Sequence, residues 1–329
     1  MNPIQRHTIR REIVLTLAYP LFWVVLLLLT ITPKWLRRHE AVLAGHIYYR
    51  MGKRARRTAR ENLQRVYGST KTPAELDQMT RDVFQNMARS FIDFFATIFI
   101  KNRKRYFRMV EVTGEEHLRR AYERGKGVIC LIPHLSIWEL SAVTPPMLGY
   151  HTSAASKAIK GKLIQQTMVW FRARRGMHNF SRDHSYNKLV QALNNGECMI
   201  LMIDQDTKVR GVFVDFFGHR AYTPLGCARL AFETGCAVVP MATIRVGNCQ
   251  YRFEIQPELP LIDTGNLEAD LTANTQAETK AMEKFVARYP LQWVWMHRRW
   301  RTTPESLAAY LEQRRQHKLQ QTHKHDSCP

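Results

Sequence analysis

Residues 127–140 read GVICLIPHLSIWEL, and this stretch decides the fold. The run 128–132 is short and apolar and is introduced by Gly127, a pattern typical of a strand buried on both faces. A helix is predicted to follow from Ser136. A buried strand that leads directly into a helix is the repeating unit of α/β proteins.

The same alternation continues downstream. Further strands are predicted over residues 198–203, 237–244 and 251–255, with an extended segment over 212–216. Helices are predicted over residues 162–174, 186–193, 225–234 and 275–288. The sequence therefore predicts an α/β fold, a central mixed sheet flanked by helices.

The chain before this core is predicted to be helical. Residues 41–110 carry apolar positions at helical spacing, and Thr72-Pro73-Ala74-Glu75 has the form of a helix start, with Thr72 as the cap. We expect four segments: an N-terminal anchor over 1–40, a helical subdomain over 41–110, the α/β domain over 111–304, and a charged C-terminal tail over 305–329.

Residues 13–32, IVLTLAYPLFWVVLLLLTIT, contain no charge. Their length meets the roughly 20 residues that a helix needs to cross a bilayer, so a membrane anchor with a transmembrane helix is predicted. The alternative is a buried or interfacial helix kinked at Pro20. Basic residues flank both ends, and their excess on the downstream side favours a cytoplasmic body.

The composition narrows the partners without choosing among them. The formal net charge is +21, with 49 Lys and Arg against 28 Asp and Glu, and this indicates a polyanionic partner: nucleic acid, an anionic membrane or an acidic protein. Hydrophobic residues make up 45% of the chain, which excludes wholesale disorder. The six cysteines form no Cys-x-x-Cys pair, so we expect reduced structural thiols and no zinc site.

His134 and Glu139 are the first candidates for chemistry. His134 follows the strand at 128–132, where ligands of open α/β sheets gather, and Glu139 falls in the first helical turn. A carboxylate that reaches back to one ring nitrogen would leave the other free to take a proton from a bound hydroxyl. The alternative is structural, because Ser136-x-x-Glu139 is also a capping box.

Three weaker signals have structural alternatives. Asp204 and Asp206 could hold a metal ion, but acids at this spacing are more often caps or partners of arginine. Gly125-Lys126-Gly127 lacks the rest of a dinucleotide-binding motif, and we expect a turn. The tryptophans at 293, 295 and 300 could stack on bases, but core or interface roles are commoner.

The His134–Glu139 motif is the first of five ordered motifs. They are His134-x₄-Glu139 with Trp138-Glu139-Leu140; Arg172, Arg174 and Arg175 ahead of Gly176; the acidic-Gln-acidic loop 204–206; the run from there to Phe216-Phe217-Gly218; and Trp295, His297, Arg298, Arg299 and Trp300. With these motifs the sequence resembles the late acyltransferases of lipid A biosynthesis, the lauroyl and myristoyl transferases. That family lies within the glycerolipid and lysophospholipid acyltransferase superfamily.

The resemblance implies a fold, a reaction and partners. It implies a glycerolipid acyltransferase-like fold, with His134 and Glu139 as catalytic residues and neither metal nor cofactor. The substrate-binding residues that it implies are Arg172, Arg174, Arg175, Asp204, Gln205, Asp206, Arg210, Gly218 and Thr223. The implied donor is an acyl carrier protein, the acceptor a hydroxyl of a lipid A precursor, and the location the bacterial inner membrane, with the catalytic domain on the cytoplasmic side.

Two alternatives stay open at this point. A related acyltransferase could act on another lipid, such as a lysophospholipid or a mannosylated phosphatidylinositol. The charge also allows a non-enzymatic protein that binds nucleic acid, although the apolar segment 13–32 and the His134–Glu139 motif argue against it.

Overall fold

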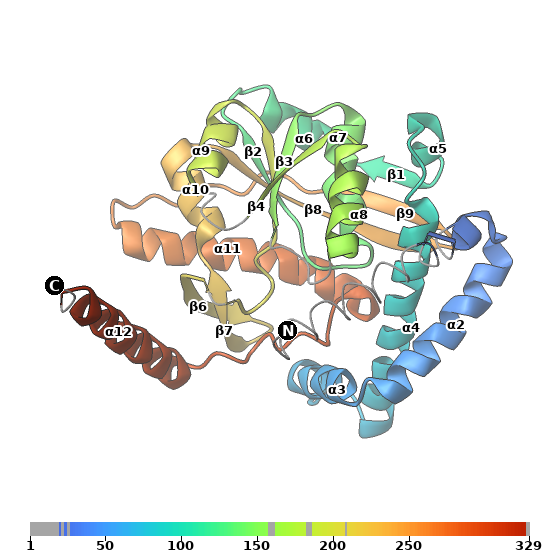
Figure 1. Ribbon diagram of the computed structural model, residues 1–329, viewed down its shortest axis with the longest axis horizontal. Helices are drawn as coiled ribbons and strands as arrows, with labels where there is room; N and C mark the ends of the chain where they lie inside the picture. Colours follow the sequence, from blue (N-terminus) through green and yellow to red (C-terminus); the bar gives the residue numbers. More distant parts are fainter. Residues whose placement is uncertain are drawn as a thin grey trace, which may run out of the picture.

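A seven-stranded mixed sheet, with strand order β1-β9-β8-β2-β5-β3-β4, forms the centre of the protein (Figure 1). The structure is a computed structural model that describes residue 20 and residues 23–24, 27–156, 162–181, 186–207 and 209–326. The sheet strands are β1 Val110–Thr113, β2 Val128–Leu131, β3 Thr152–Ser156, β4 Met177–Ser181, β5 Cys198–Leu201, β8 Ala237–Gly247 and β9 Gln250–Ile255. Only the pair β8–β9 is antiparallel among these neighbours, and the prediction of a mixed sheet is confirmed.

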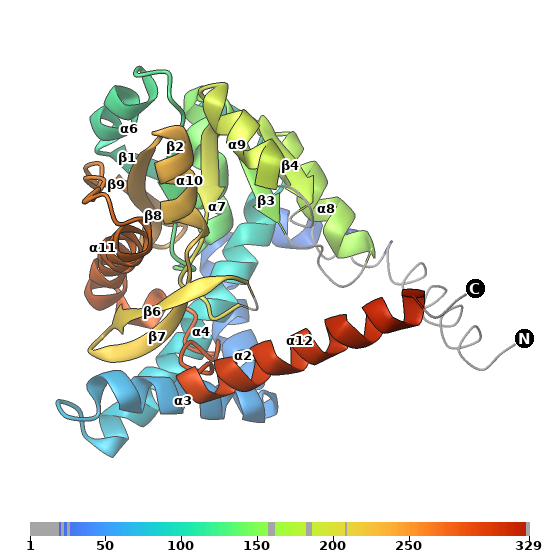
Figure 2. The same cartoon turned by 90° about the vertical axis from the view of Figure 1, so that its left-hand side faces the viewer.

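Helices cover both faces of the sheet. The helices that the structure describes are α2 Lys34–Met51, α3 Lys53–Tyr67, α4 Pro73–Thr97, α5 Arg103–Phe107, α6 Glu115–Tyr122, α7 Trp138–Leu148, α8 Lys162–Ala173, α9 Tyr186–Asn194, α10 Gly226–Thr234, α11 Leu267–Arg288 and α12 Pro304–Asp326, with a short 3₁₀ turn at Pro290–Gln292. In Figure 2, α12 extends away from the body that the other helices and the sheet form.

The alternation of side chains along β2 explains the two layers. Val128 and Cys130 pack with residues of α4, α6, α7 and α8, whereas Ile129 and Leu131 pack with residues of α9, α10 and α11. Successive side chains of a strand point to opposite faces, so a strand that is apolar at every position requires helices on both sides. All four residues of β2 are buried, as the sequence predicts.

The N-terminal helices share a core with the end of the α/β domain. Leu63 of α3 and Phe84 of α4 are buried with Trp293 and Trp295. Asn62 donates its side-chain amide to the carbonyl oxygens of Trp295 and His297 at 2.8 and 2.7 Å. The start of α4 matches its prediction, because Thr72 and Glu75 form a reciprocal capping box with Pro73 in the first turn.

A two-stranded hairpin, β6 Gly211–Phe216 and β7 His219–Pro224, lies outside the main sheet. Its two-residue loop places Phe217 and Gly218 at φ values of 56° and 74°, the arrangement of a type I′ turn. This hairpin contains the predicted extended segment 212–216. The predicted helix 275–288 is the second half of the longer α11.

Most of residues 13–32, the predicted membrane anchor, lies outside the described residues. Within the part of the chain that the structure describes, no helix is both long and apolar enough to cross a bilayer. The five cysteines among the described residues are buried and unpaired, which confirms the prediction of structural thiols.

Candidate active site

His134 occupies the first turn of chain after β2, at the carboxyl edge of the sheet. The sheet register continues to Ile132, whose N–H donates to the carbonyl oxygen of Leu201 at 2.9 Å, and the chain then leaves the sheet at Pro133. Leu135 forms an isolated antiparallel bridge with Trp293, and the N–H of Ser136 donates to the carbonyl oxygen of Gln292 at 2.7 Å. The C-terminal end of the domain therefore fixes the loop that carries His134.

Asp204 is the carboxylate that contacts His134. It follows β5, the neighbour of β2, so the two loops meet at the same edge of the sheet. His134 Nδ1 lies 2.7 Å from Asp204 Oδ1, and the backbone N–H of His134 donates to Asp204 Oδ2 at 2.7 Å. Because an ionised carboxylate only accepts hydrogen bonds, Nδ1 carries the proton and Nε2 is left as the basic nitrogen.

The environment of Asp204 keeps it ionised. The side chain is fully buried, and Trp293 Nε1 donates to its Oδ2 at 2.8 Å. Burial alone would raise the pKa of this carboxyl group, but the attraction to His134 in its protonated form and the hydrogen bonds from His134 and Trp293 outweigh it and lower the pKa to about 2. Asp204 thus presents a fixed negative charge to the imidazole.

Glu139 does not take the role that the sequence predicts for it. Arg172 of α8 donates Nε to Glu139 Oε2 at 2.9 Å and Nη2 to Oε1 at 2.6 Å, and its Nη1 donates to Asn179 at 3.1 Å. Since both carboxylate oxygens face Arg172, the predicted contact of Glu139 with His134 is replaced by that of Asp204. Helix α7 begins only at Trp138, and this start turns Glu139 toward α8.

The capping-box alternative is also wrong. Ile137, and not Ser136, precedes the first residue of α7, and no side chain caps this helix. Ser136 adopts a φ of 50°, a left-handed conformation that residues other than glycine rarely adopt, and its hydroxyl contacts no described polar atom.

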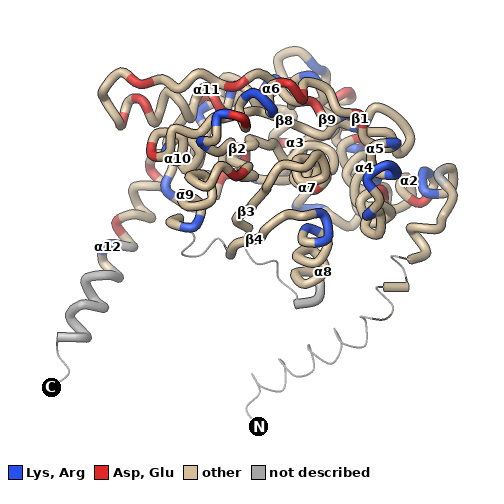
Figure 3. Tube along the Cα trace, turned by 90° about the horizontal axis from the view of Figure 1, so that it is seen from above, with Lys and Arg blue, Asp and Glu red and all other residues tan. Residues whose placement is uncertain are grey.

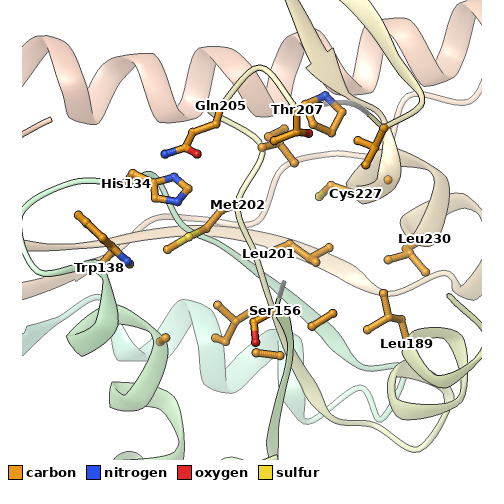
Figure 4. A pocket seen from close by; sticks show the side chains of 18 of the residues that line it. His134, Trp138, Ser156, Leu189, Leu201, Met202, Gln205, Thr207, Cys227 and Leu230 are labelled. Atoms are coloured by element: carbon orange, nitrogen blue, oxygen red, sulfur yellow. The ribbon is translucent and has the colours of Figure 1, made fainter. Parts of the chain in front are cut away.

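A cavity of about 550 Å³ opens in front of His134. Its walls are mostly apolar and come from α7, β3, the end of β5 and α10. Figure 4 shows His134 and Trp138 at one end, Met202 and Gln205 close to the ring, and Leu189 and Leu230 at the other end. The volume falls within the range of about 300–1,000 Å³ that is usual for small-molecule sites.

The predicted substrate-binding residues divide into two groups. Arg172, Gln205 and Arg210 line the cavity, and Arg210 is exposed. Arg174 is exposed in the turn directly after α8, and its guanidinium lies 4.7 Å from the centre of the Trp170 ring. The described lining of the cavity therefore offers two exposed cations, Arg210 and Arg229, and one cation already paired with a carboxylate, Arg172.

The other predicted substrate-binding residues hold the fold. The buried Arg175 donates to the carbonyl oxygens of Phe171, Thr97 and Ile100, so its guanidinium is held by the fold, and its phosphate-binding role stays a prediction. Burial lowers the pKa of Arg175 to about 10, still well above neutrality. The fixed guanidinium ties the end of α8 to the end of α4.

Asp206, Gly218 and Thr223 also have structural partners. Asp206 accepts from Arg301 at 3.1 Å and from the N–H of Thr302 at 2.7 Å. Thr223 is buried beneath Arg299, which donates to its hydroxyl, and Gly218 supplies the positive φ of the hairpin turn. These contacts give the three residues structural roles, and their binding of substrate stays a prediction.

Asp204 and Asp206 also do not converge as metal ligands would, because their carboxylates bind different groups. Among the described residues, no three His, Cys, Asp or Glu side chains come together as a metal site.

Two contributors to the site were not predicted. The sequence suggests a core or interface role for Trp293, whereas its indole N–H contacts the carboxylate beside the base. Arg299 is buried within the same region and donates to the carbonyl oxygen of Tyr222 at 2.7 Å. Burial lowers the pKa of Arg299 to about 10, against the opposing effect of Asp204 and Asp206. The partnership of His134 with Asp204 could have been predicted, because both follow buried strands and such strand ends share one edge.

The arrangement can perform general base catalysis. His134 Nε2 can accept a proton from a hydroxyl bound in the cavity, and the resulting imidazolium is stabilised by the fixed charge of Asp204. In such a reaction the nucleophile is the substrate's own hydroxyl group. Figure 4 shows Gln205 close to the ring of His134, with Thr207 and Ser156 among the other polar side chains that line the cavity.

Comparison with known proteins supports this chemistry. The model of the bacterial lipid A biosynthesis acyltransferase family matches residues 7–302. A phosphatidylinositol mannoside acyltransferase of Mycolicibacterium smegmatis is 29% identical over 73% of this chain and 78% of its own. A lipid A biosynthesis acyltransferase of Haemophilus influenzae is 25% identical over 87% of this chain and 88% of its own. A lipid A biosynthesis lauroyltransferase of Escherichia coli is 26% identical, over 80% and 84%.

Proposed function

Since the chain belongs to the bacterial lipid A biosynthesis acyltransferase family, we propose that it transfers a fatty acyl chain from an acyl carrier protein to a hydroxyl group of a lipid A precursor. The observation that carries the proposal is the pair His134–Asp204, hydrogen bonded at 2.7 Å at one end of a mostly apolar cavity of about 550 Å³. Membership of an enzyme family also favours this function over nucleic-acid binding.

The proposed reaction is direct acyl transfer. His134 Nε2 takes the proton of the acceptor hydroxyl as its oxygen attacks the carbonyl carbon of the thioester. The carbon–sulfur bond then breaks, and the leaving thiolate takes the proton back from His134. An ester and a free thiol are formed, and Asp204 stays ionised throughout. Glu139 holds Arg172 at the cavity wall and acts as a positioning residue.

The donor's acyl chain is assigned to the cavity in front of His134. Each methylene group transferred from water to such a wall contributes roughly 0.8 kcal/mol. Gln205 and Arg210 stand beside this cavity and suit the polar arm of a thioester donor. A separate cleft of about 600 Å³ supports a strongly acidic carrier protein as the acyl donor, because basic side chains line it: Lys53, Arg54, Arg298 and Arg301.

We place the protein at the bacterial inner membrane, held by the N-terminal segment 13–32 with the catalytic domain on the cytoplasmic side. The described residues that continue from this segment support the placement, because apolar side chains of α2 are exposed: Val42, Leu43, Ile47 and Met51. Such a face is suited to contact with lipid.

Purified protein incubated with acyl carrier protein charged with a fatty acid and a lipid A precursor tests the function. We expect a product that is heavier by one acyl group in mass spectrometry, and none with His134→Ala. Absence of product from the intact protein with every acyl-carrier donor tried would refute the proposal.

A second acceptor is supported by the 29% identity to a phosphatidylinositol mannoside acyltransferase. A mannosylated phosphatidylinositol would present a sugar hydroxyl to the same His134. Offering both acceptors with the same donor decides between them, because the true acceptor should give the higher kcat/KM.

A further inference from the structure

The loop after β5 carries a polar side chain that the catalytic pair does not use. Gln205 stands between Asp204 and Asp206 and lines the catalytic cavity. Both neighbours are buried, and their carboxylates are bound within the protein. The backbone N–H of Asp206 also donates to His297 Nε2 at 3.0 Å. The backbone of Gln205 is therefore held from both sides, while its side chain faces the cavity.

The side-chain amide of Gln205 is available to a ligand. Figure 4 shows the end of this side chain turned toward the ring of His134. The residue is half-buried, and its amide has no hydrogen-bond partner among the described residues. An amide group carries two N–H donors and one carbonyl acceptor. A substrate that reaches the catalytic base therefore also meets a donor that the protein leaves unused.

Acyl transfer requires a donor close to the base. When the acceptor hydroxyl attacks the thioester, the electron pair of the C=O bond moves onto the carbonyl oxygen, which becomes negative. The pair returns when the carbon–sulfur bond breaks, and the thiolate takes the proton from His134. A donor fixed beside this oxygen lowers the barrier, because its hydrogen bond is stronger in the transition state than in the ground state.

The donors of the loop that carries His134 are already engaged. The backbone N–H groups of His134, Leu135 and Ser136 all donate to acceptors of the protein itself. The guanidinium of Arg172 lines the cavity, but each of its three nitrogens donates to a side chain of the protein. Stabilisation of a developing charge next to the base must therefore come from another part of the site.

The exposed cations of the lining belong to the α10 end of the cavity. The carbonyl oxygen of Arg210 accepts from the N–H of Leu225, directly before α10, and Arg229 lies within that helix. Figure 4 shows Leu230 of α10 at the end of the cavity opposite His134. These arginines are suited to a charged group far from the reacting carbon, which leaves neutral side chains to act beside the base.

Trp138 is the other neutral side chain with a polar hydrogen beside His134. Its ring packs against the rings of His134 and Phe91, with centroids 5.4 and 6.3 Å apart. The indole carries a single N–H in a ring that forms part of the wall, whereas the amide of Gln205 ends a side chain that projects into the cavity. This difference favours Gln205 as the donor.

We propose that Gln205 is a further catalytic residue, whose amide N–H donates to the carbonyl oxygen of the acyl thioester and stabilises its negative charge in the transition state. This inference rests on the proposed function and adds how the same site activates the donor. The two loops at one edge of the sheet then act on different substrates. His134 takes the proton of the acceptor hydroxyl, and Gln205 binds the carbonyl oxygen of the donor.

Gln205→Met tests the proposal, because it keeps the length of the side chain and removes its N–H groups. We expect kcat for acyl transfer to fall roughly 10²-fold, as is typical when one donor to an oxyanion is lost, with little change in the KM for the thioester. The melting temperature should hardly change, since the amide binds no described part of the protein. A kcat close to that of the wild type, or a raised KM with an unchanged kcat, would overturn the proposal.

Two further variants make the test specific. Thr207→Val removes a hydroxyl from the same loop and the same cavity, and it should leave kcat near the wild-type value. Trp138→Phe removes the indole N–H but keeps an aromatic ring against His134, and it should cost far less than Gln205→Met. If Trp138→Phe gives the larger loss of kcat, the indole is the donor and the assignment of Gln205 is wrong.

A binding measurement separates this inference from the proposed function. Wild type and Gln205→Met are titrated in detergent micelles with two unreactive analogues of an acyl thioester that share one alkyl chain. One is a planar methylene ketone, and the other is a tetrahedral phosphonate whose anionic oxygen stands in for the charged carbonyl oxygen. Weaker binding of the phosphonate alone by Gln205→Met supports the proposal even if no acyl transfer to a lipid A precursor is detected. Equal weakening of both analogues, or of neither, refutes it.

Discussion

The loop after β2 and the loop after β5 leave the sheet at the same edge, but their polar groups are used differently. Around Asp204 and Asp206 every carboxylate oxygen accepts a hydrogen bond from the protein itself. In the first loop the Nε2 of His134 faces a cavity and the hydroxyl of Ser136 has no described partner. The first loop thus presents its imidazole to the cavity, whereas the carboxylate of Asp204 in the second loop fixes the position of His134 in the first.

The comparison predicts the largest effect at His134. His134→Ala removes the base, and we expect turnover to fall by roughly 10²–10⁴-fold while the melting temperature changes little. His151→Ala is the control, because that residue is exposed in the connection between α7 and β3. Near-normal acylation by purified His134→Ala would break the assignment of the first loop as the catalytic one.

A second test separates the two carboxylates. Asp204→Asn keeps the shape but removes the charge and the preference for a proton on Nδ1, so we expect kcat to fall by about 10²-fold or more. Glu139→Gln loosens Arg172 and should cost less, because this carboxylate does not contact the imidazole. Should Glu139→Gln reduce kcat more than Asp204→Asn, the dyad predicted from the sequence motif would be restored.

These two carboxylates also show how far the sequence could lead. The buried strands at 128–132 and 198–203 and the helices after them were predicted because their apolar runs are continuous. Strands β3 and β4 were missed, since TSAAS and MHNFS contain no such run. The place of His134 directly after a buried strand predicts its role, whereas the motif His134-x₄-Glu139 offers a carboxylate that does not contact it.

The partner was missed because spacing along the chain describes only local geometry. Asp204 is 70 residues from His134, and parallel pairing of β2 with β5 brings them together. Trp293, which also contacts Asp204, lies a further 89 residues along the chain. Likewise, the arginines at 174 and 175 look equivalent in sequence, yet one is exposed and the other is buried against carbonyl oxygens. Tertiary packing alone distinguishes them.

The second loop should also contribute stability that depends on pH. The folded pKa of Asp204 is lowered to about 2 from 3.8, so its stabilising effect is complete above pH 4 and is lost as the pH falls toward 2. A shift of this size corresponds to about 2 kcal/mol. Urea unfolding of wild type and Asp204→Asn between pH 2 and 5 measures it. The two free energies of unfolding should converge at the acid end, and a constant difference would contradict the fixed charge of Asp204.

The smallest effect on the reaction is expected from charge changes in the basic cleft next to the second loop. Asp206 binds Arg301, and Arg301 borders the basic cleft that also contains Lys53, Arg54 and Arg298. No acidic side chain is present in the described lining of this cleft. An acidic carrier protein that approaches here would be steered by several charges at once, whereas a small thioester would respond to the charges within its own cavity.

Reversal of Lys53, Arg54 and Arg298 to glutamate should therefore raise the KM for the acyl carrier protein several-fold and flatten its salt dependence, because exposed charges are screened over roughly 10 Å at 0.1 M salt. Arg56 is left in place, since its Nη1 donates to the carbonyl oxygen of Tyr49 at 2.9 Å. The matched control reverses Lys101, Lys104 and Arg105 around α5, which Figure 1 shows well apart from α3 and which Figure 3 marks as another basic region. Both triple variants change the net charge equally, so net charge alone predicts equal effects. Two results would contradict this prediction: a KM raised as much by the control as by the cleft variant, or a reaction with acyl carrier protein that does not respond to salt. Either result would mean that the basic cleft does not dock the carrier protein and that the donor is recognised within the cavity alone.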